Sequence, residues 1–259
     1  MTFRRGGLEP AAAVAAAVVY GLGASTSIAG WSPPPWAWVA VKMVPALALA
    51  AYTARRLGES GRPVAVGLAW HGLGDGLLEL GPALFLAGLG AFLVGHLFYA
   101  EAFARRLGRL RETPAWRKLA AVGTIGASVG VLVAIRPALS GPPAVAVPIY
   151  AVTLAATTVL ALLGRWRRPW VVLGTLLFLA SDACLGLRLF GPSTLHGAGL
   201  AVWPTYAAAQ FLIATGYVAE VRDERWIGRR GDRGWNPPRS RRQCSWTRVR
   251  RRGPDRTSS

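Results

Sequence analysis

The chain has 259 residues, of which 53% are hydrophobic and only 16% are charged. Soluble domains carry about 25% charged residues, so this composition indicates a membrane protein and excludes an ordinary soluble enzyme. The net charge of +18 alone would suggest a nucleic-acid partner. The basic residues, however, stand between apolar stretches, which is the pattern of membrane topology and predicts no binding to nucleic acid.

Eight stretches of the chain are candidates for membrane-spanning helices. A spanning helix needs roughly 20 apolar residues, because about 30 Å of hydrocarbon is covered at 1.5 Å per residue. The third stretch is shorter than the others and is interrupted by polar residues. We therefore predict an all-α fold, an integral membrane bundle of eight transmembrane helices, at residues 8–28, 36–54, 64–80, 83–104, 117–136, 144–163, 169–190 and 199–219.

The connections between these stretches alternate in charge. Arg and Lys gather before the first span, in every second loop after it and in the tail, whereas each intervening loop carries at most one Arg. Positively charged loops stay on the cytoplasmic side of a membrane. Both termini are therefore predicted to be cytoplasmic, in a multi-pass protein of the plasma membrane. The residues that set this orientation are Arg4, Arg5, Arg55, Arg56, Arg62, Arg105, Arg106, Arg109, Arg111, Arg117, Lys118, Arg165, Arg167 and Arg168.

A change in composition predicts two parts of the chain. Residues 1–220 contain all eight spans, whereas residues 221–259 are rich in Arg, Gly, Pro and Ser and lack apolar periodicity. We predict an eight-helix transmembrane domain followed by an Arg-rich cytoplasmic tail. The tail is interpreted either as disordered chain or as a polybasic strip that, with the basic loops, contacts anionic lipid headgroups.

Several ionisable side chains fall inside the predicted spans. A charge at the centre of a bilayer costs at least ~2.5–3.5 kcal/mol, so such residues indicate a functional site. At 1.5 Å per residue, four polar groups from four spans lie about 8–12 Å below the outer boundary, while His96 lies deeper, at about 20 Å. The four residues of this layer are Lys42, Asp75, Asp182 and Tyr206.

Helical spacing adds further polar residues to the same candidate site. Three pairs of polar residues each share one face of a helix, because their members are three or four residues apart. Polar faces are penalised against lipid, so they should point into the bundle and towards one another. The pairs are His71 with Asp75, His96 with Tyr99, and Tyr206 with Gln210.

Six local sequences, taken together, resemble the YhhN-type lysoplasmalogenase family. No single motif is decisive, but six of them in the family's order on an eight-span frame are specific. They extend over most of the chain, at residues 41–45, 72–75, 85–99, 174–182, 206 and 210–213.

The resemblance implies a multispanning hydrolase that cleaves the vinyl ether bond of lysoplasmalogens, which are single-chain 1-alkenyl glycerophospholipids. The products would be a fatty aldehyde and glycerophosphocholine or glycerophosphoethanolamine. The two aspartates held to be essential in that family correspond to Asp75 and Asp182.

The chemistry of the reaction suits these residues. Vinyl ether hydrolysis begins with protonation of the alkene carbon, which gives an oxocarbenium ion; water then adds, and the hemiacetal collapses. This sequence needs one carboxylic acid and one carboxylate, as in glycosidases, which pass through a similar cation. Asp75 and Asp182 are predicted to take the two roles, in an order that the sequence leaves open. No metal or cofactor is required, and the residues expected to bind or orient the substrate or water are Lys42, His71, His96, Tyr99, Tyr206 and Gln210.

Two other classes of protein fit the same residues. A proton-coupled transporter would also place aspartates, a lysine and histidines on facing helices near the midplane of the bilayer. A metal-dependent intramembrane lipid hydrolase would use the histidines and aspartates as ligands, although their scatter over three helices permits such a site without indicating it. A retinal-type receptor is disfavoured, because Lys42, the only lysine expected to be buried, lies in the second span rather than near the C-terminus.

Overall fold

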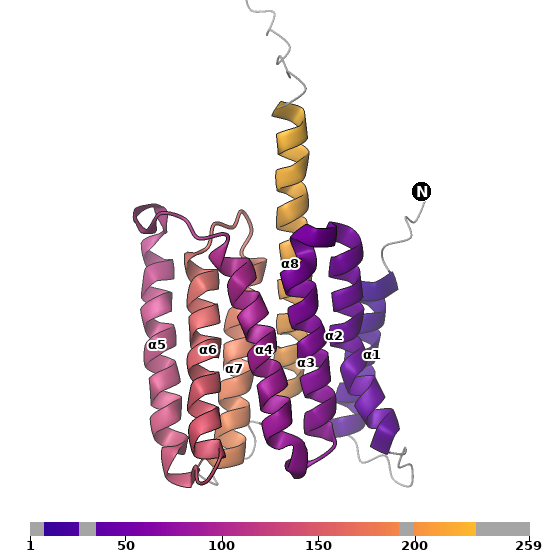
Figure 1. Cartoon of the computed structure of the whole chain (residues 1–259), viewed down its shortest axis with the longest axis vertical. Helices are drawn as coiled ribbons and strands as arrows, with labels where there is room; N and C mark the ends of the chain where they lie inside the picture. The colour runs from indigo at the N-terminus through magenta and orange to yellow at the C-terminus, as the bar shows by residue number, and fades with distance from the viewer. Residues whose placement is uncertain (1–7, 26–34, 192–198, 232–259) are drawn as a thin grey trace, which may run out of the picture. The chain divides into compact units, whose positions relative to one another are not determined.

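The computed structural model describes residues 8–25, 35–191 and 199–231, which form helices joined by short loops (Figure 1). These ranges contain no β-strand, only an isolated bridge between Leu107 and Gly164. The predicted all-α class is thereby confirmed. The chain divides into two compact units, Met1–Asp223 and Glu224–Ser259, and the first contains α1 to α7 and most of α8.

Each predicted span contains one α-helix. The bounds of the first seven helices lie within three residues of the predicted ones, whereas the last helix continues to Gly231 instead of ending at residue 219. Residues 232–259 of the predicted tail lie outside the described residues. The elements are α1 (Leu8–Ser25), α2 (Pro35–Leu57), η1 (Gly58–Gly61), α3 (Arg62–Glu79), η2 (Pro82–Leu84), α4 (Phe85–Ala104), η3 (Leu110–Glu112), α5 (Ala115–Ile135), η4 (Arg136–Ala138), α6 (Pro143–Leu163), α7 (Trp170–Phe190) and α8 (Gly199–Gly231).

Five helical segments among the described residues are long and apolar enough to cross a membrane. The first of them comprises both α2 and α3, which lie side by side and run in opposite directions (Figure 1). The number of crossings and the side on which each terminus lies therefore stay predictions. The segments are Trp36–Glu79, Pro82–Ala104, Ala115–Ala138, Pro143–Leu163 and Trp170–Phe190.

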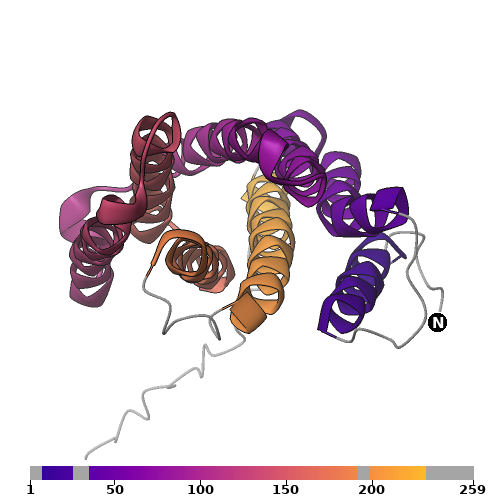
Figure 2. The same cartoon turned by 90° about the horizontal axis from the view of Figure 1, so that it is seen from below.

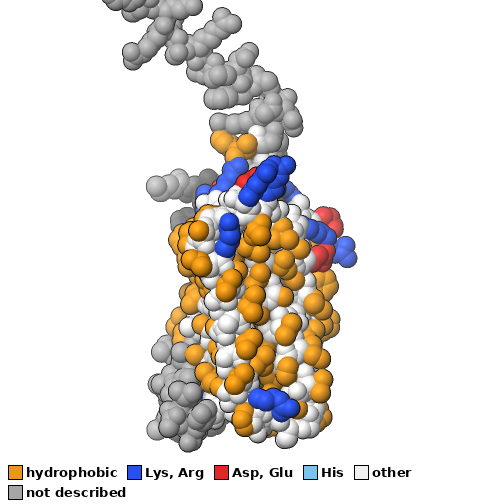
Figure 3. Space-filling model, turned by 90° about the vertical axis from the view of Figure 1, so that its left-hand side faces the viewer, with side chains coloured by type: hydrophobic (Ala, Val, Ile, Leu, Met, Phe, Trp, Pro, Cys, Tyr) orange, Lys and Arg blue, Asp and Glu red, His pale blue; other side chains and the backbone are white. Residues whose placement is uncertain are grey.

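The surface of α5 is apolar in the way expected of a lipid-facing helix. Leu119 is 72% exposed, and Val122 and Val133 are each 68% exposed. On this side of the molecule, hydrophobic side chains cover the middle and Lys and Arg gather towards one end (Figure 3). Water would penalise such a large exposed apolar area, whereas hydrocarbon does not.

Within the first unit, the helices follow an arc in the order α1, α2, α3, α4, α6 and α5, and α7 and α8 lie on its inner side (Figure 2). The side chains of Tyr99, Phe103, Phe178 and Ile213, from three helices, are almost completely buried there. At Gly174 of α7, an added Cβ would lie only 2.9 Å from the Ala209 carbonyl oxygen of α8. The absence of a side chain at this position lets α7 and α8 pack in close contact.

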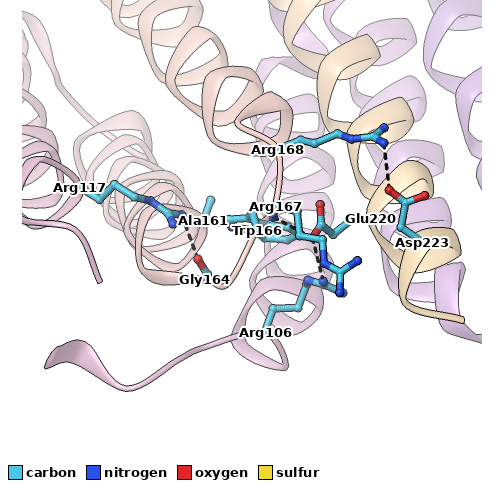
Figure 4. A network of polar contacts seen from close by, with 9 residues as sticks. All are labelled: Arg106, Arg117, Ala161, Gly164, Trp166, Arg167, Arg168, Glu220 and Asp223. Carbon is cyan, nitrogen blue, oxygen red and sulfur yellow. Dashed lines mark hydrogen bonds and ion pairs between the residues drawn. The ribbon is translucent and has the colours of Figure 1, made fainter. Parts of the chain in front are cut away.

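A polar network fastens the end of the bundle at which α4 ends and α7 begins, called here the basic end (Figure 4). The buried carboxylate of Glu220 on α8 accepts a hydrogen bond of 2.8 Å from the Arg167 backbone N–H and lies 3.8 Å from the Arg106 guanidinium. The same guanidinium stacks 4.7 Å from the ring centroid of Trp166. These contacts join the loop after α4, the loop after α6, and α8.

Two further arginines bind backbone or side chains at the basic end. Arg117 of α5 donates to the carbonyl oxygens of Ala161 and Gly164, at 3.0 and 2.9 Å. Arg168 pairs with Asp223 at 3.0 Å. Arginines that the sequence suggested as determinants of orientation therefore also hold neighbouring helices together.

Candidate active site

Close packing of α3 against α4 positions the first buried polar residues. An added Cβ on Gly95 would lie 2.4 Å from Nε2 of His71, and one on Gly67 would lie 2.7 Å from the Tyr99 ring. Glycine is needed at both positions, because any side chain would collide with these rings. The two helices can therefore enclose an imidazole and a phenol at their interface.

The carboxylate of Asp75 ends a chain of hydrogen bonds between α3, α4 and α8. Tyr206 donates to Asp75 Oδ2 at 2.6 Å, and Gln210 Nε2 donates to the Tyr206 hydroxyl at 3.1 Å. The same amide nitrogen lies 3.0 Å from Nδ1 of His71, while Tyr99 donates to Gln210 Oε1 at 2.6 Å. Since Nε2 of Gln210 is a donor, Nδ1 of His71 accepts, which fixes its imidazole as the tautomer protonated on Nε2.

The carboxylate of Asp182 has a separate partner on α6. Tyr150 donates its hydroxyl proton to Asp182 Oδ2, and the same hydroxyl lies 3.3 Å from Nε2 of His96. Because the single hydroxyl proton is used for Asp182, His96 can bond to this oxygen only as a donor. The three residues form a second chain, between α4, α6 and α7.

Aromatic packing joins the two hydrogen-bonded chains of side chains. The ring centroids of His71 and His96 are 4.8 Å apart, and the Phe178 ring of α7 lies 5.2 Å from the first and 4.6 Å from the second. Two carboxyl groups that are 107 residues apart in the sequence thus belong to one site, in which Asp75 is buried and Asp182 is partly buried.

The structure gives Lys42 a partner that the sequence did not identify. Its ammonium group lies 2.9 Å from the Glu79 carboxylate, and the two side chains are 17% and 27% exposed. Glu79 lies about one turn after Asp75 on α3. An ion pair therefore stands beside the Asp75 end of the site.

An apolar cavity of about 110 Å³ adjoins the Asp182 end of the site. Its walls come from α4, α5, α6 and α7, and Tyr150 and Asp182 are two of its few polar residues; Asp75 is not among the lining residues.

The described residues contain no group of three or more His, Cys, Asp or Glu that could hold a metal ion, so the metal-dependent alternative has no ligand set among them.

Comparison with models of known protein families shows to which family the chain belongs. The model of the YhhN family matches residues 37–217, which run from α2 into α8 and include every residue of both hydrogen-bonded chains. The chain belongs to the YhhN family. The resemblance inferred from the sequence is thereby confirmed.

Two curated proteins are similar to this YhhN-family chain, one from Mycobacterium bovis and one from Mycobacterium tuberculosis, and both are named lysoplasmalogenase. Each is 36% identical over 177 residues, which is 66% of this chain and 66% of the relative. The alignment thus covers slightly less than two thirds of the relatives' length. No solved structure shows significant similarity to the chain.

The structure unites most of the predicted site residues of this YhhN-family protein and adds two that sequence reasoning missed. Seven of the eight predicted residues lie in the two chains, and Lys42 stands beside them. Tyr150 and Phe178 were not predicted, although both are central. A tyrosine in an otherwise apolar span was the available signal for Tyr150, whereas nothing distinguishes Phe178 from any other apolar side chain of a spanning helix.

Proposed function

We propose that this protein is a membrane hydrolase that cleaves the vinyl ether bond of lysoplasmalogens to a fatty aldehyde and glycerophosphocholine or glycerophosphoethanolamine. The observation that carries the proposal is that Asp75 and Asp182 belong to one cluster of polar and aromatic side chains, each accepting a hydrogen bond from a tyrosine. The name of the two relatives and membership of the YhhN family support the substrate class.

The reaction balances with two carboxyl groups and one water molecule. A protonated carboxyl gives its proton to the outer alkene carbon, and the adjacent carbon and the ether oxygen share the positive charge of an oxocarbenium ion. The other carboxylate takes a proton from water as its oxygen attacks, which gives a hemiacetal. The hemiacetal loses its hydroxyl proton to the first carboxylate while the second carboxyl protonates the departing glycerol oxygen, so both groups recover their initial states.

The remaining residues of the site orient and polarise this pair. Tyr206 and Tyr150 hold the two carboxyls, while Gln210 and the histidines fix the tyrosines. Lys42, which pairs with Glu79, places a positive charge beside the Asp75 end of the site. We further propose that the chain crosses the plasma membrane eight times with both termini in the cytoplasm, so that a single-chain lipid enters from the outer leaflet.

Aldehyde release by the purified protein tests the proposal directly. The wild type should release aldehyde from a lysoplasmalogen and none from its saturated-ether analogue, because only the alkene can be protonated at carbon. Asp75→Asn and Asp182→Asn should each reduce the rate by at least about 100-fold, the usual contribution of a general acid or base. Asp223→Asn, which removes an exposed carboxylate paired with Arg168, is the matched control and should keep the wild-type rate.

Two results would overturn the proposal. Turnover that survives either site substitution would remove the acid and base roles of the aspartates. Failure of the wild type to cleave a lysoplasmalogen, with proton-coupled uptake in vesicles instead, would favour the transporter alternative.

A further inference from the structure

The cavity beside Asp182 has the composition of a binding site for hydrocarbon. It is lined by apolar side chains of four helices, among them Leu89 of α4, Leu132 of α5, Leu154 of α6 and Leu185 of α7. Its volume of about 110 Å³ is several times the ~10–15 Å³ that one water molecule needs. An apolar chamber with a few convergent polar groups is the usual form of a small-ligand site.

The polar groups of the cavity are those of the second hydrogen-bonded chain. Asp182 and Tyr150 form part of its wall, together with Ser128, whose buried hydroxyl has no hydrogen-bond partner among the described residues. A carboxyl, a phenol and an unsatisfied hydroxyl therefore face the same apolar space. A ligand that fits all of them is apolar and carries one weakly polar atom, such as an ether oxygen.

The cavity extends from the middle of the bundle towards the ends of α5 and α7. Its α7 wall runs from Leu179 to Phe190, and Asp182 lies about 12 Å from Phe190 along the helix axis at 1.5 Å per residue. Leu189 in this wall is 49% exposed, so the cavity reaches the outer surface of the bundle. A lipid can therefore enter sideways from the membrane.

We propose that this cavity, between α4, α5, α6 and α7, binds the alkenyl segment of the substrate, so that Asp182 rather than Asp75 contacts the outer alkene carbon. The inference rests on the proposed function and assigns its order: Asp182 gives the proton to the alkene carbon. If water were present, it would accept the proton of Asp182 more readily than the alkene carbon does. The apolar walls of the cavity keep water away from that carbon, so the proton can be transferred to it. Low polarity around Asp182 also strengthens its interaction with the developing cation.

Gly186 offers a direct way to fill the cavity. It lines the α7 wall, and the nearest atom to an added Cβ is Ile135 Cδ1 at 3.8 Å, an ordinary contact. Gly186→Ala should therefore fold, while Gly186→Leu should project into the space proposed for the substrate chain. Gly130→Leu on α5 is the matched control, because an added Cβ there meets nothing within 4 Å and the residue does not line the cavity.

The test combines kinetics with covalent labelling by a lipid that cannot be hydrolysed. Gly186→Leu should raise KM for a long-chain lysoplasmalogen at least 10-fold, while Gly130→Leu leaves it unchanged. A saturated 1-O-alkyl lysophospholipid with a diazirine near its ether should label residues of the α4–α7 walls after irradiation. This labelling should be lost in Gly186→Leu and kept in Gly130→Leu.

The two proposals fail in different ways. Labelling next to Asp75 and Lys42 instead, or labelling and KM unaffected by Gly186→Leu, would overturn the cavity assignment even if aldehyde is released normally. Labelling of the cavity walls by the alkyl lipid, without aldehyde release from the alkenyl lipid, would support the cavity as a chain-binding site and overturn the proposed reaction.

Discussion

Each aspartate of the site is held by a tyrosine from a different helix, and the two tyrosines differ in what supports them. Tyr206 is fixed by Gln210, which is itself tied to Tyr99 and His71. Tyr150 contacts His96 through its hydroxyl group and also lines the apolar cavity. The Asp75 side is therefore a rigid network, whereas the Asp182 side is open to a ligand.

We predict that Tyr150→Phe reduces aldehyde release about 10–150-fold without unfolding the protein. The change removes one hydrogen bond to a carboxyl group, and bonds to charged groups contribute about 1.5–3 kcal/mol. The rate of the purified variant is compared with that of Tyr52→Phe, whose tyrosine lies on α2 with Arg56 over its ring. An unchanged rate in Tyr150→Phe would show that its hydroxyl has no part in the reaction.

At the residue level, the sequence predicted the groups whose presence in a membrane is costly. Asp75, Asp182 and His96 stand out because an ionisable side chain in an apolar span requires a partner. Tyr150 has no comparable cost, since a phenol is tolerated in spanning helices, and its role emerges only from the contact across α6 and α7. Likewise, Lys42 was expected at the site, but its ion pair with Glu79 depends on the facing of α2 and α3.

At the level of elements, glycines decide where helices can approach. In α4, Gly95 faces the His71 ring, while Gly90 in the same helix has nothing within 4 Å of an added Cβ. Glycine therefore has different roles at these two positions, which are five residues apart in the same helix. In the first position it makes room for the site, and in the second it only lowers helix propensity.

We predict that Gly95→Ala displaces His71 and lowers both thermal stability and aldehyde release, whereas Gly90→Ala leaves the activity unchanged and is neutral or stabilising. An added methyl at residue 95 would lie 2.3 Å from the His71 ring, so the helices must separate. At residue 90 the change gains up to ~1 kcal/mol of helix propensity. Unfolding temperatures and rates of both variants in detergent check this; equal behaviour of the two would contradict it.

The basic end depends on a different kind of contact, the buried carboxylate of Glu220. We predict that Glu220→Ala destabilises the bundle by about 1–3 kcal/mol, because it removes the partly buried hydrogen bond from the Arg167 N–H and the ion pair with Arg106. Glu59→Ala removes an exposed carboxylate paired with Arg62 at 3.6 Å and should cost less than about 1 kcal/mol. Thermal unfolding of the two variants is compared, and a similar loss in both would refute a structural role for Glu220.

Helix positions followed from the apolar stretches and from the Gly and Pro residues between them. The end of α8 was misjudged, because the prediction stopped where apolar residues stop. The helix continues past residue 219 with polar residues such as Glu220 and Asp223, which bind the loop after α6. Hydropathy predicts the membrane-embedded part of a helix and not its polar extension.

At the level of the whole molecule, the arrangement places α7 and α8 inside an arc of the other helices (Figure 2). Short loops predict that consecutive helices are neighbours, and α3 with α4 conforms to this expectation. They do not predict that α8 returns to pack against α3 and α4. That return brings Tyr206 and Gln210 to Asp75 and Tyr99, and completes the site.

The predicted membrane orientation can be tested with single cysteines in intact cells. Cys184 is replaced, and cysteines are placed singly at two exposed loop positions, Glu112 between α4 and α5 and Ser140 between α5 and α6, with Cys244 kept only when the tail is probed. A membrane-impermeant maleimide should label Ser140→Cys from outside, but reach Glu112→Cys and Cys244 only after the membrane is permeabilised. Four helices separate residue 112 from the tail, so both should lie on the same, cytoplasmic side, as basic loops do. Labelling of Cys244 but not of Glu112→Cys in intact cells would mean an odd number of crossings after residue 112 and would contradict the eight-span topology. Labelling of both Glu112→Cys and Cys244, but not of Ser140→Cys, would mean that the orientation is inverted.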